Sequence, residues 1–189
     1  MSTARGLHYT HAEYLALEEE SSVRHEYLAG EIYAMAGGSP DHAALAAMVI
    51  ALLGRQPPTG CRVFTSDLRV QTVSGLSTYP DVSVVCGRTQ RAANDPHAVV
   101  NPVLIAEITS NSTEDYDRGE KLQHYKSLPT LREVLIASHR EPLLSLWRRE
   151  EQGWTEVRAS RGETLELRSL AMRLAVDDVY RDALEDAAV

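Results

Sequence analysis

The sequence has few of the signatures that mark the best-known enzyme classes. It has no HExxH pattern and no other paired histidine spacing, so a zinc site is not expected. It also has no Gly-rich phosphate loop and no GxSxG elbow, which argues against those nucleotide-binding and serine-hydrolase classes. No apolar run approaches ~20 residues and no basic-then-apolar signal opens the chain, so we expect an intracellular, cytoplasmic protein with no membrane partner.

Cysteine is also scarce. The chain has two, Cys61 and Cys86, which are far apart and each fall in an expected strand. Unpaired cysteine is often buried, and disulfides are rare in a reducing compartment. We therefore predict two buried free thiols.

The chain offers no place at which to divide it. It has no Gly/Ser-rich or Pro-rich linker and no internal repeat, and 189 residues are enough for one full-sized core, so we predict a single domain over residues 1–189. Its net charge of −8 repels phosphate backbones at long range. That charge argues against non-specific nucleic-acid binding through the overall field, but a local metal site stays possible because divalent cations cancel carboxylates.

The hydrophobic pattern predicts an α/β fold, with a mixed central sheet flanked by helices and extended by N-terminal and C-terminal β-hairpins. Thr10 and Glu13 form a capping box at the start of the first helix, and Ser39 with Pro40 starts a second that ends at Gly54. Between these helices we expect a hairpin that turns at Gly30. The segments 62–64 and 68–73 predict either one strand interrupted near Asp67 or a hairpin arm bent there. Further strands are predicted over 79–86, 103–108, 133–138, 143–149 and 154–159, with a loop over 87–101 and a short helix within 174–184 that begins near Asp177.

The segment 102–125 contains the most informative residues. Glu107 stands inside an apolar run, and a carboxylate buried there must be paired, hydrogen-bonded, protonated or bound to a metal. The residues that follow predict one helix capped by Ser112. On that helix Lys121 is one turn from Asp117 and one turn from Tyr125, on the face expected to pack inward.

Asp81 and Glu107 are acids on strands that follow one another in the sequence, so they are expected to be neighbours in one sheet. Two carboxylates beside an inward lysine suit metal-dependent phosphodiester hydrolysis, because hard oxygen ligands hold Mg²⁺ or Mn²⁺ and the metal lowers the pKa of a bound water. The alternative is structural. Asp81 would then cap a strand end, and Glu107 would form a buried salt bridge with Lys121.

Several motifs are informative in combination, although none is specific by itself. They are the segments 26–31, 39–42, 65–67, 79–81, 101–104, 107–113 and 117–125. Together they resemble the Uma2 family, also called DUF820, which has a restriction-endonuclease-like PD-(D/E)xK fold, and the resemblance spans nearly the whole chain.

The resemblance implies a nuclease whose metal is held by Asp81 and Glu107, with the family's lysine moved to the following helix as Lys121. This chain departs from the family at two places. Thr109 and Asn111 stand where a hydrophobic residue and a proline are usual, and Ala29-Gly30 replaces an Asp-Gly turn. Neither departure removes an expected ligand.

Four further residues are candidates for a surrounding shell. Asp67 either supports the site or only interrupts a strand, and Tyr125 is expected in the core with its hydroxyl toward the site. Glu31 and Glu26, both on the hairpin, either close the site or are solvated, and we expect them to be solvated. His42 is in a position to contact a phosphate, but a histidine in a first helical turn is expected at the surface.

The sequence thus predicts a Mg²⁺-dependent (or Mn²⁺-dependent) nuclease that acts on DNA as a homodimer. Two alternatives stay open at this stage. One is a non-catalytic dimeric binding or assembly module with the same fold, and the other is a hydrolase of small phosphorylated metabolites.

Overall fold

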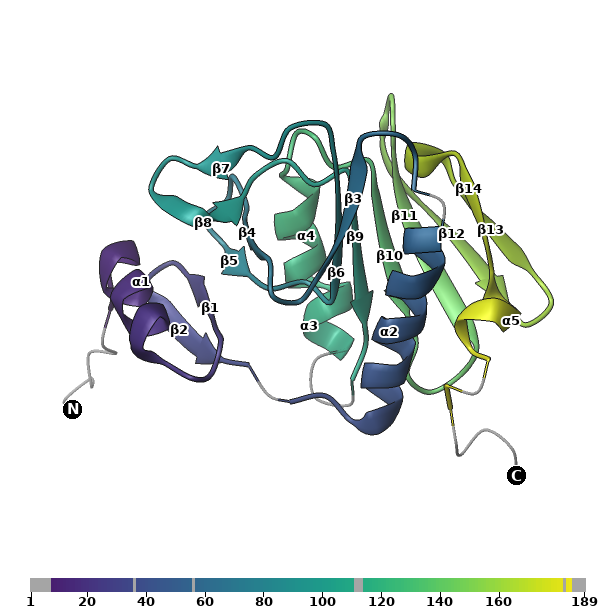
Figure 1. Ribbon diagram of the computed structural model, residues 1–189, viewed down its shortest axis with the longest axis horizontal. Coiled ribbons are helices and arrows are strands. Elements are labelled where there is room, and N and C mark those ends of the chain that lie inside the picture. The colour runs from purple at the N-terminus through teal and green to yellow at the C-terminus, as the bar shows by residue number, and fades with distance from the viewer. Residues whose placement is uncertain (1–7, 36, 56, 111–113, 182, 185–189) are drawn as a thin grey trace.

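The structure is a computed structural model, and it describes residues 8–35, 37–55, 57–110, 114–181 and 183–184 (Figure 1). The helices in these ranges are α1 (His11–Glu20), α2 (Pro40–Arg55), α3 (Glu114–Arg118), α4 (Glu120–Lys126), the short 3-10 helix η1 (Arg168–Leu170) and α5 (Val176–Val179). The strands are β1 (His25–Leu28), β2 (Glu31–Ala34), β3 (Cys61–Thr65), β4 (Arg69–Gln71), β5 (Ser77–Thr78), β6 (Val82–Cys86), β7 (Arg91–Ala92), β8 (Asp95–Val99), β9 (Leu104–Ile108), β10 (Glu133–Ala137), β11 (Leu143–Glu150), β12 (Gly153–Ser160), β13 (Thr164–Leu167) and β14 (Met172–Ala175).

The central sheet has six strands in the order β12-β11-β10-β9-β6-β3. β9 and β10 are parallel, and the other neighbours are antiparallel. Figure 1 shows α2 across one face of this sheet and α3 with α4 behind the other. A mixed sheet flanked by helices, as the sequence predicts, is confirmed.

Each face of the central sheet packs into its own core, because successive side chains of a strand point to opposite sides. In β9, Leu104 and Ala106 join the core formed with α2, whereas Ile105 joins the core that contains Leu122 and Tyr125 of α4. The two cores fix which face of the sheet each polar residue of β9 meets.

A second six-stranded sheet has the order β2-β1-β5-β4-β8-β7. The chain starts this sheet with β1 and β2, adds β4 and β5 after β3, and adds β7 and β8 after β6. The segment 62–73 therefore spans two sheets, whereas 79–86 contains only β6 of the central sheet. The sequence indicates an interruption near Asp67, and the structure has a turn there between β3 and β4. The segment 87–101, predicted as a loop, instead contains β7 and β8. That prediction was wrong because strands this short give little periodicity.

The local signals near the N-terminus are confirmed. Thr10 and Glu13 form the reciprocal capping box of α1, and the amide N–H of His42 donates to Ser39 Oγ at 3.2 Å at the start of α2. The hairpin of β1 and β2 turns at Ala29 and Gly30, which have φ values of 51° and 93°. A non-glycine residue in this conformation is uncommon, so the Ala29 departure places alanine where Asp tolerates the backbone better.

The C-terminal hairpin of β11 and β12 is also confirmed, but it continues the central sheet through β10 rather than standing apart from it. The hairpin that pairs β13 with β14 after it was not predicted. The short helix predicted within 174–184 is confirmed as α5, which is four residues long. Both pack on the α2 side of the central sheet.

The helix predicted after β9 is two helices. Gly119 separates α3 from α4, and a Cβ added there would lie 2.7 Å from the Asp115 carbonyl oxygen. Only a glycine fits so close an approach without a shift of the backbone. The predicted cap Ser112 lies outside the described residues.

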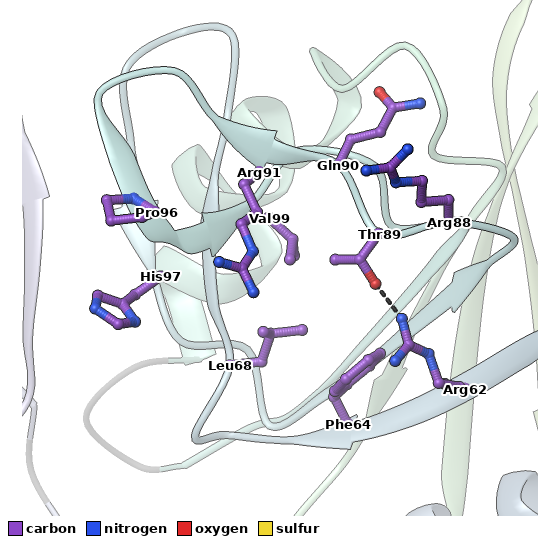
Figure 2. Close-up of a pocket in the computed structure, with 10 residues that line it drawn as sticks. All are labelled: Arg62, Phe64, Leu68, Arg88, Thr89, Gln90, Arg91, Pro96, His97 and Val99. Atoms are coloured by element: carbon purple, nitrogen blue, oxygen red, sulfur yellow. Dashed lines mark hydrogen bonds between the residues drawn. The ribbon is translucent and has the colours of Figure 1, made fainter.

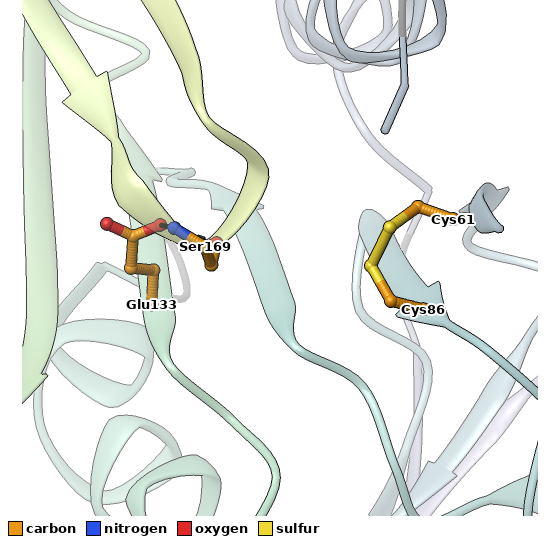
Figure 3. The surroundings of a disulfide bond; sticks show 4 residues. All are labelled: Cys61, Cys86, Glu133 and Ser169. Atoms are coloured by element: carbon orange, nitrogen blue, oxygen red, sulfur yellow. Dashed lines mark hydrogen bonds between the residues drawn. A yellow bond between two sulfur atoms is a disulfide. The ribbon is translucent and has the colours of Figure 1, made fainter. Parts of the chain in front are cut away.

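The prediction of two free thiols was wrong. Cys61 in β3 and Cys86 in β6 are directly opposite each other in the antiparallel register, and they form a disulfide (Figure 3). The bond joins the outermost strand of the central sheet to its neighbour. Sequence spacing could not reveal it, because the pairing depends on the register of two strands separated by the excursion into the second sheet.

Candidate active site

Glu107 lies near the end of β9, where every residue is buried. Its side chain shares the face of Ile105, toward α4, and only 4% of the residue is exposed. Burial raises the pKa of Glu107 to about 8, although the positive charge of Lys121 acts in the opposite direction. Glu107 can therefore hold a proton near neutral pH when no further cation is near it.

Asp81 immediately precedes β6, the antiparallel neighbour of β9. Its amide N–H donates to Glu107 Oε2 at 3.3 Å, and the amide N–H of Ile108 donates to Asp81 Oδ2 at 2.8 Å. These two bonds cross between the strands in opposite directions and hold the carboxylates side by side. The prediction that Asp81 and Glu107 come from neighbouring strands is confirmed.

Lys121 of α4 extends into the same cluster and is 6% exposed. Its Nζ lies 3.1 Å from Glu107 Oε1, 3.0 Å from Glu26 Oε1 and 3.6 Å from Asp117 Oδ1. Burial acts to lower the pKa of Lys121, but the surrounding negative charges outweigh it and hold that pKa well above its ordinary value. The amine is therefore a fixed positive charge. The inward direction predicted for Lys121 is confirmed.

The hydroxyl of Tyr125 donates a hydrogen bond to Glu107 Oε1, the oxygen that also meets Lys121. Tyr125 is fully buried, as expected from its place on the inner face of α4. It therefore fixes the orientation of the carboxylate from the side of the helix.

Glu26 was predicted to be solvated, and that prediction was wrong. It is 8% exposed, pairs with Lys121 and accepts a hydrogen bond from Thr78 Oγ1. β1 carries Glu26 inward because it pairs with β5 in the second sheet, so the N-terminal hairpin forms one side of the site. The sequence gives no local signal for this, because the contact depends on pairing across about fifty residues.

His42 was expected at the surface, and it lies instead beside Asp81. Its Nε2 is 3.3 Å from Asp81 Oδ2, and the side chain is 19% exposed. The hydrogen bond to Asp81 raises the pKa of His42, against the opposing effect of burial. α2 thus contributes a group to the site from the opposite side to α4.

Two other candidates lie outside the cluster. Asp67 has a side chain that is 77% exposed, and it forms an ion pair with Arg24 and a hydrogen bond with Thr65. Glu31 is exposed and accepts a hydrogen bond from the Tyr33 hydroxyl. Glu31 is therefore solvated, as predicted. Of the two alternatives for Asp67, the structure agrees with the one in which it interrupts a strand and does not support the site.

Glu26, Asp81, Glu107, Lys121 and His42 line a cavity of about 720 Å³ whose charged groups are mainly acidic, and which we call the acidic cavity. Its charged lining consists of five carboxylates and one lysine, namely Glu26, Asp81, Glu107, Asp117, Glu120 and Lys121. Tyr116, Ser110 and His139 line it as well and were not anticipated from the sequence. The Thr109 departure is accommodated at its edge, where Thr109 Oγ1 lies 2.8 Å from His139 Nδ1.

The carboxylates suit a hard divalent cation held by few protein ligands. Within the described ranges, no group of three or more His, Cys, Asp or Glu side chains is arranged to hold a metal ion. Mg²⁺ is commonly bound through one or two carboxylates, with waters and substrate phosphate completing the shell. Asp81 and Glu107 supply two carboxylates, and Asp81 Oδ1 has no hydrogen-bond partner among the described residues. The residues therefore fit such an ion.

Comparisons with known proteins agree with this fold. A solved structure from Anabaena variabilis, titled as "a putative nuclease belonging to DUF820", has a TM-score of 0.71 over 92% of this chain and 98% of that one, at 21% identity. Two Synechocystis proteins are closer in sequence. "Uncharacterized protein slr1290" is 36% identical over 89% of this chain and 90% of its own length, and "Uncharacterized protein sll1609" is 37% identical over 67% and 73%.

A family model described as "Uma2: Putative restriction endonuclease" matches residues 11–177. This range includes both sheets and every residue of the acidic cavity. The chain belongs to the Uma2 family.

Proposed function

We propose that this protein is a nuclease that hydrolyses DNA phosphodiester bonds with the help of Mg²⁺ or Mn²⁺. The observation that carries the proposal is the convergence of Asp81, Glu107 and Lys121 in one cavity, each from a different element. Membership of a family described as restriction endonucleases supports the same class of reaction.

Asp81 and Glu107 would hold the ion, which on binding neutralises phosphate charge and makes a bound water more acidic. Tyr125 and the Asp81 amide keep the Glu107 carboxylate in one orientation. Lys121 donates hydrogen bonds from a fixed positive charge, so it can position the attacking water and stabilise negative charge that develops on the phosphate.

The experiment compares cleavage of single-stranded and double-stranded DNA by the wild type, Asp81→Asn and Lys121→Ala, with and without added Mg²⁺ or Mn²⁺. Asp67→Asn is the matched control, because it removes the same charge from an exposed position outside the cavity. We expect cleavage that needs the metal, is lost in the first two variants and is kept in the control. Equal activity in all four proteins would overturn the proposal and indicate a contaminating nuclease.

A second candidate function is a non-catalytic binding or assembly module. The observation that favours it is that Lys121 already satisfies three buried carboxylates, as a structural ion-pair cluster would. Calorimetric titration with Mg²⁺ or Mn²⁺ distinguishes the two. Binding that is lost in Glu107→Gln supports the nuclease, whereas no binding together with strong destabilisation by the same substitution supports the module.

The homodimer, the single domain and the cytoplasmic location stay predictions. Among the helices of the described ranges, none combines the length and apolar character that a bilayer crossing would require.

The disulfide between Cys61 and Cys86 weighs against a strongly reducing compartment. Thiol trapping in fractionated cells would test the location, and sedimentation velocity would test the dimer.

A further inference from the structure

A second large hollow lies away from the acidic cavity, between β3 and the strands β7 and β8 (Figure 2). It has a volume of about 950 Å³, and its charged lining is entirely basic. We call it the arginine groove, defined by Arg62, Arg88 and Arg91 with His97. No Asp or Glu lines it. A hollow whose charged residues are all basic is unexpected in a chain of net charge −8.

Among the described residues, the three arginines have no acidic partner. No carboxylate of the described residues lies within 4.0 Å of their guanidinium groups. Elsewhere in the described part of the chain, eight arginines form ion pairs. The groove therefore presents cations that no internal anion neutralises, and all three are exposed.

Arg62 is also held in place. Its guanidinium donates a hydrogen bond to Thr89 Oγ1 and lies over the Phe64 ring, 5.3 Å from the ring centre. Figure 2 shows Arg62 and Arg91 reaching toward the middle of the hollow from opposite sides. A guanidinium that is already ordered loses less freedom when it binds an anion, and its planar fork matches phosphate oxygens.

The groove and the acidic cavity share one face of the central sheet. Phe64 is the register partner of Ser83, and Ser83 is the partner of Ile105, so the three side chains share a face. Arg62 and Glu107 are each two residues from a member of this row and share that face too. Asp81 precedes β6 and Arg88 follows it, so the chain between them spans at most roughly 23 Å at ~3.3 Å per residue, and the bend at Gly87, with a φ of 78°, shortens this to the order of 20 Å.

We propose that the arginine groove binds the phosphodiester backbone of the nucleic acid about 20 Å from the bond at which the acidic cavity acts. This inference rests on the proposed function, because it gives the substrate of that cavity a second point of attachment. The groove also explains how a protein with a net negative charge can bind a polyanion such as DNA. The overall field repels DNA at long range, whereas a local set of unpaired arginines displaces counterions from the backbone on contact.

The test is DNA binding measured by fluorescence anisotropy in EDTA, so that no cleavage occurs. The probes are a labelled single strand of about 20 nucleotides and the corresponding duplex, each longer than the roughly six phosphates per strand that 20 Å of duplex spans. The variant is Arg88→Gln/Arg91→Gln. The matched control is Arg161→Gln/Arg173→Gln, which removes two exposed, unpaired arginines near the β13–β14 hairpin.

We expect the groove variant to bind at least one probe roughly 10- to 60-fold more weakly near 0.1 M salt, and the slope of log K against log salt to fall by about 1.4 to 1.8. The control should change neither quantity by a comparable amount. Both variants should keep the wild-type unfolding curve, because all four side chains are exposed.

Three outcomes would overturn the proposal. They are wild type that binds neither probe, a groove variant that binds both as tightly as wild type, and a control variant that loses as much affinity as the groove variant. The proposed function is judged separately by cleavage. DNA binding through the groove without metal-dependent cleavage would remove the nuclease and keep the groove, whereas cleavage by a groove variant with unchanged affinity would do the reverse.

A length series sharpens the result. For this series Ca²⁺ replaces EDTA, because without a divalent cation the carboxylates of the cavity repel phosphate. A strand too short to reach from Asp81 to Arg88 cannot use both places at once, so binding in the wild type should strengthen steeply as the oligonucleotide grows beyond roughly six nucleotides. In Arg88→Gln/Arg91→Gln this step should disappear. A step of the same size in both proteins would place the second contact elsewhere and overturn the assignment to the groove.

Discussion

The acidic cavity and the arginine groove share one face of the central sheet but differ in the sign of their charge and in whether that charge is paired within the protein. In the cavity, carboxylates outnumber the one lysine, and Lys121 is buried among them with each contact fixed. In the groove, the arginines are exposed and no described carboxylate meets them. The comparison shows that the net charge of the chain predicts the local charge of neither the cavity nor the groove. A charged side chain with partners inside the protein stabilises the fold, whereas one without such partners is available to a ligand.

The first test removes one cation from the acidic cavity and one from the arginine groove. Lys121→Met leaves three buried carboxylates without their shared partner and should lower the free energy of unfolding by about 3 to 5 kcal/mol. Arg62→Met removes an exposed cation and should cost under about 1 kcal/mol. Urea unfolding measures both, and equal costs would show that the two charges have the same structural role.

The second test removes the disulfide. Cys61→Ser/Cys86→Ser should lower the free energy of unfolding by about 3 kcal/mol, because the bond closes a loop with a sequence separation of 25 residues. The bond lies one residue from Arg62 and two from Arg88, so DNA affinity should also fall. Mg²⁺ binding in the acidic cavity should be kept. Oxidised wild type and the double variant with identical unfolding curves would contradict this.

The third test concerns how the cavity holds Glu107. Tyr125→Phe removes a buried hydroxyl that donates to Glu107 and should cost about 2 kcal/mol, because a buried carboxyl oxygen then loses one of its partners. The control is Tyr33→Phe, which removes a hydroxyl that donates to Glu31 at the surface and should cost under about 0.5 kcal/mol. Thermal or urea unfolding compares them. Similar costs would mean that burial does not strengthen the Glu107 contact.

The smallest expected effect tests the order of the groove. Thr89→Val keeps the side-chain shape but removes the oxygen that accepts from Arg62, so DNA affinity should fall about two- to tenfold while stability stays nearly unchanged. Thr65→Val makes the same change on an exposed threonine outside the groove lining and should leave affinity unchanged. Anisotropy titration at one salt concentration is sufficient. Wild-type affinity in Thr89→Val would show that Arg62 does not need to be held.

The residues that the sequence located have local signals. Glu107 interrupts an apolar strand, and the helical positions of Lys121 and Tyr125 relative to Leu122 give their direction. Asp81 stands at the start of a strand that the sequence also located. These patterns lie within a few residues of each side chain, and the structure places all four residues together.

The residues that the sequence misplaced depend on distant pairing. Glu26 is buried because β1 pairs with β5, and His42 lies beside Asp81 because α2 crosses the central sheet. The second sheet is built from strands of two to five residues, too short to show a clear alternation. The Cys61–Cys86 bond follows from strand register, which spacing alone cannot supply. Local patterns thus identified the central residues of the acidic cavity but not the elements that enclose them.

The glycine at position 119 has a consequence for how this sequence can vary. α3 stops there, and α4 begins at Glu120 with Leu122 and Tyr125 packed into the core that contains Ile105. Asp117 before the break and Lys121 after it both reach the acidic cavity, where Oδ1 and Nζ are 3.6 Å apart. A side chain at position 119 would shift the backbone that joins these two residues, so the sequence cannot change there without moving one charge relative to the other.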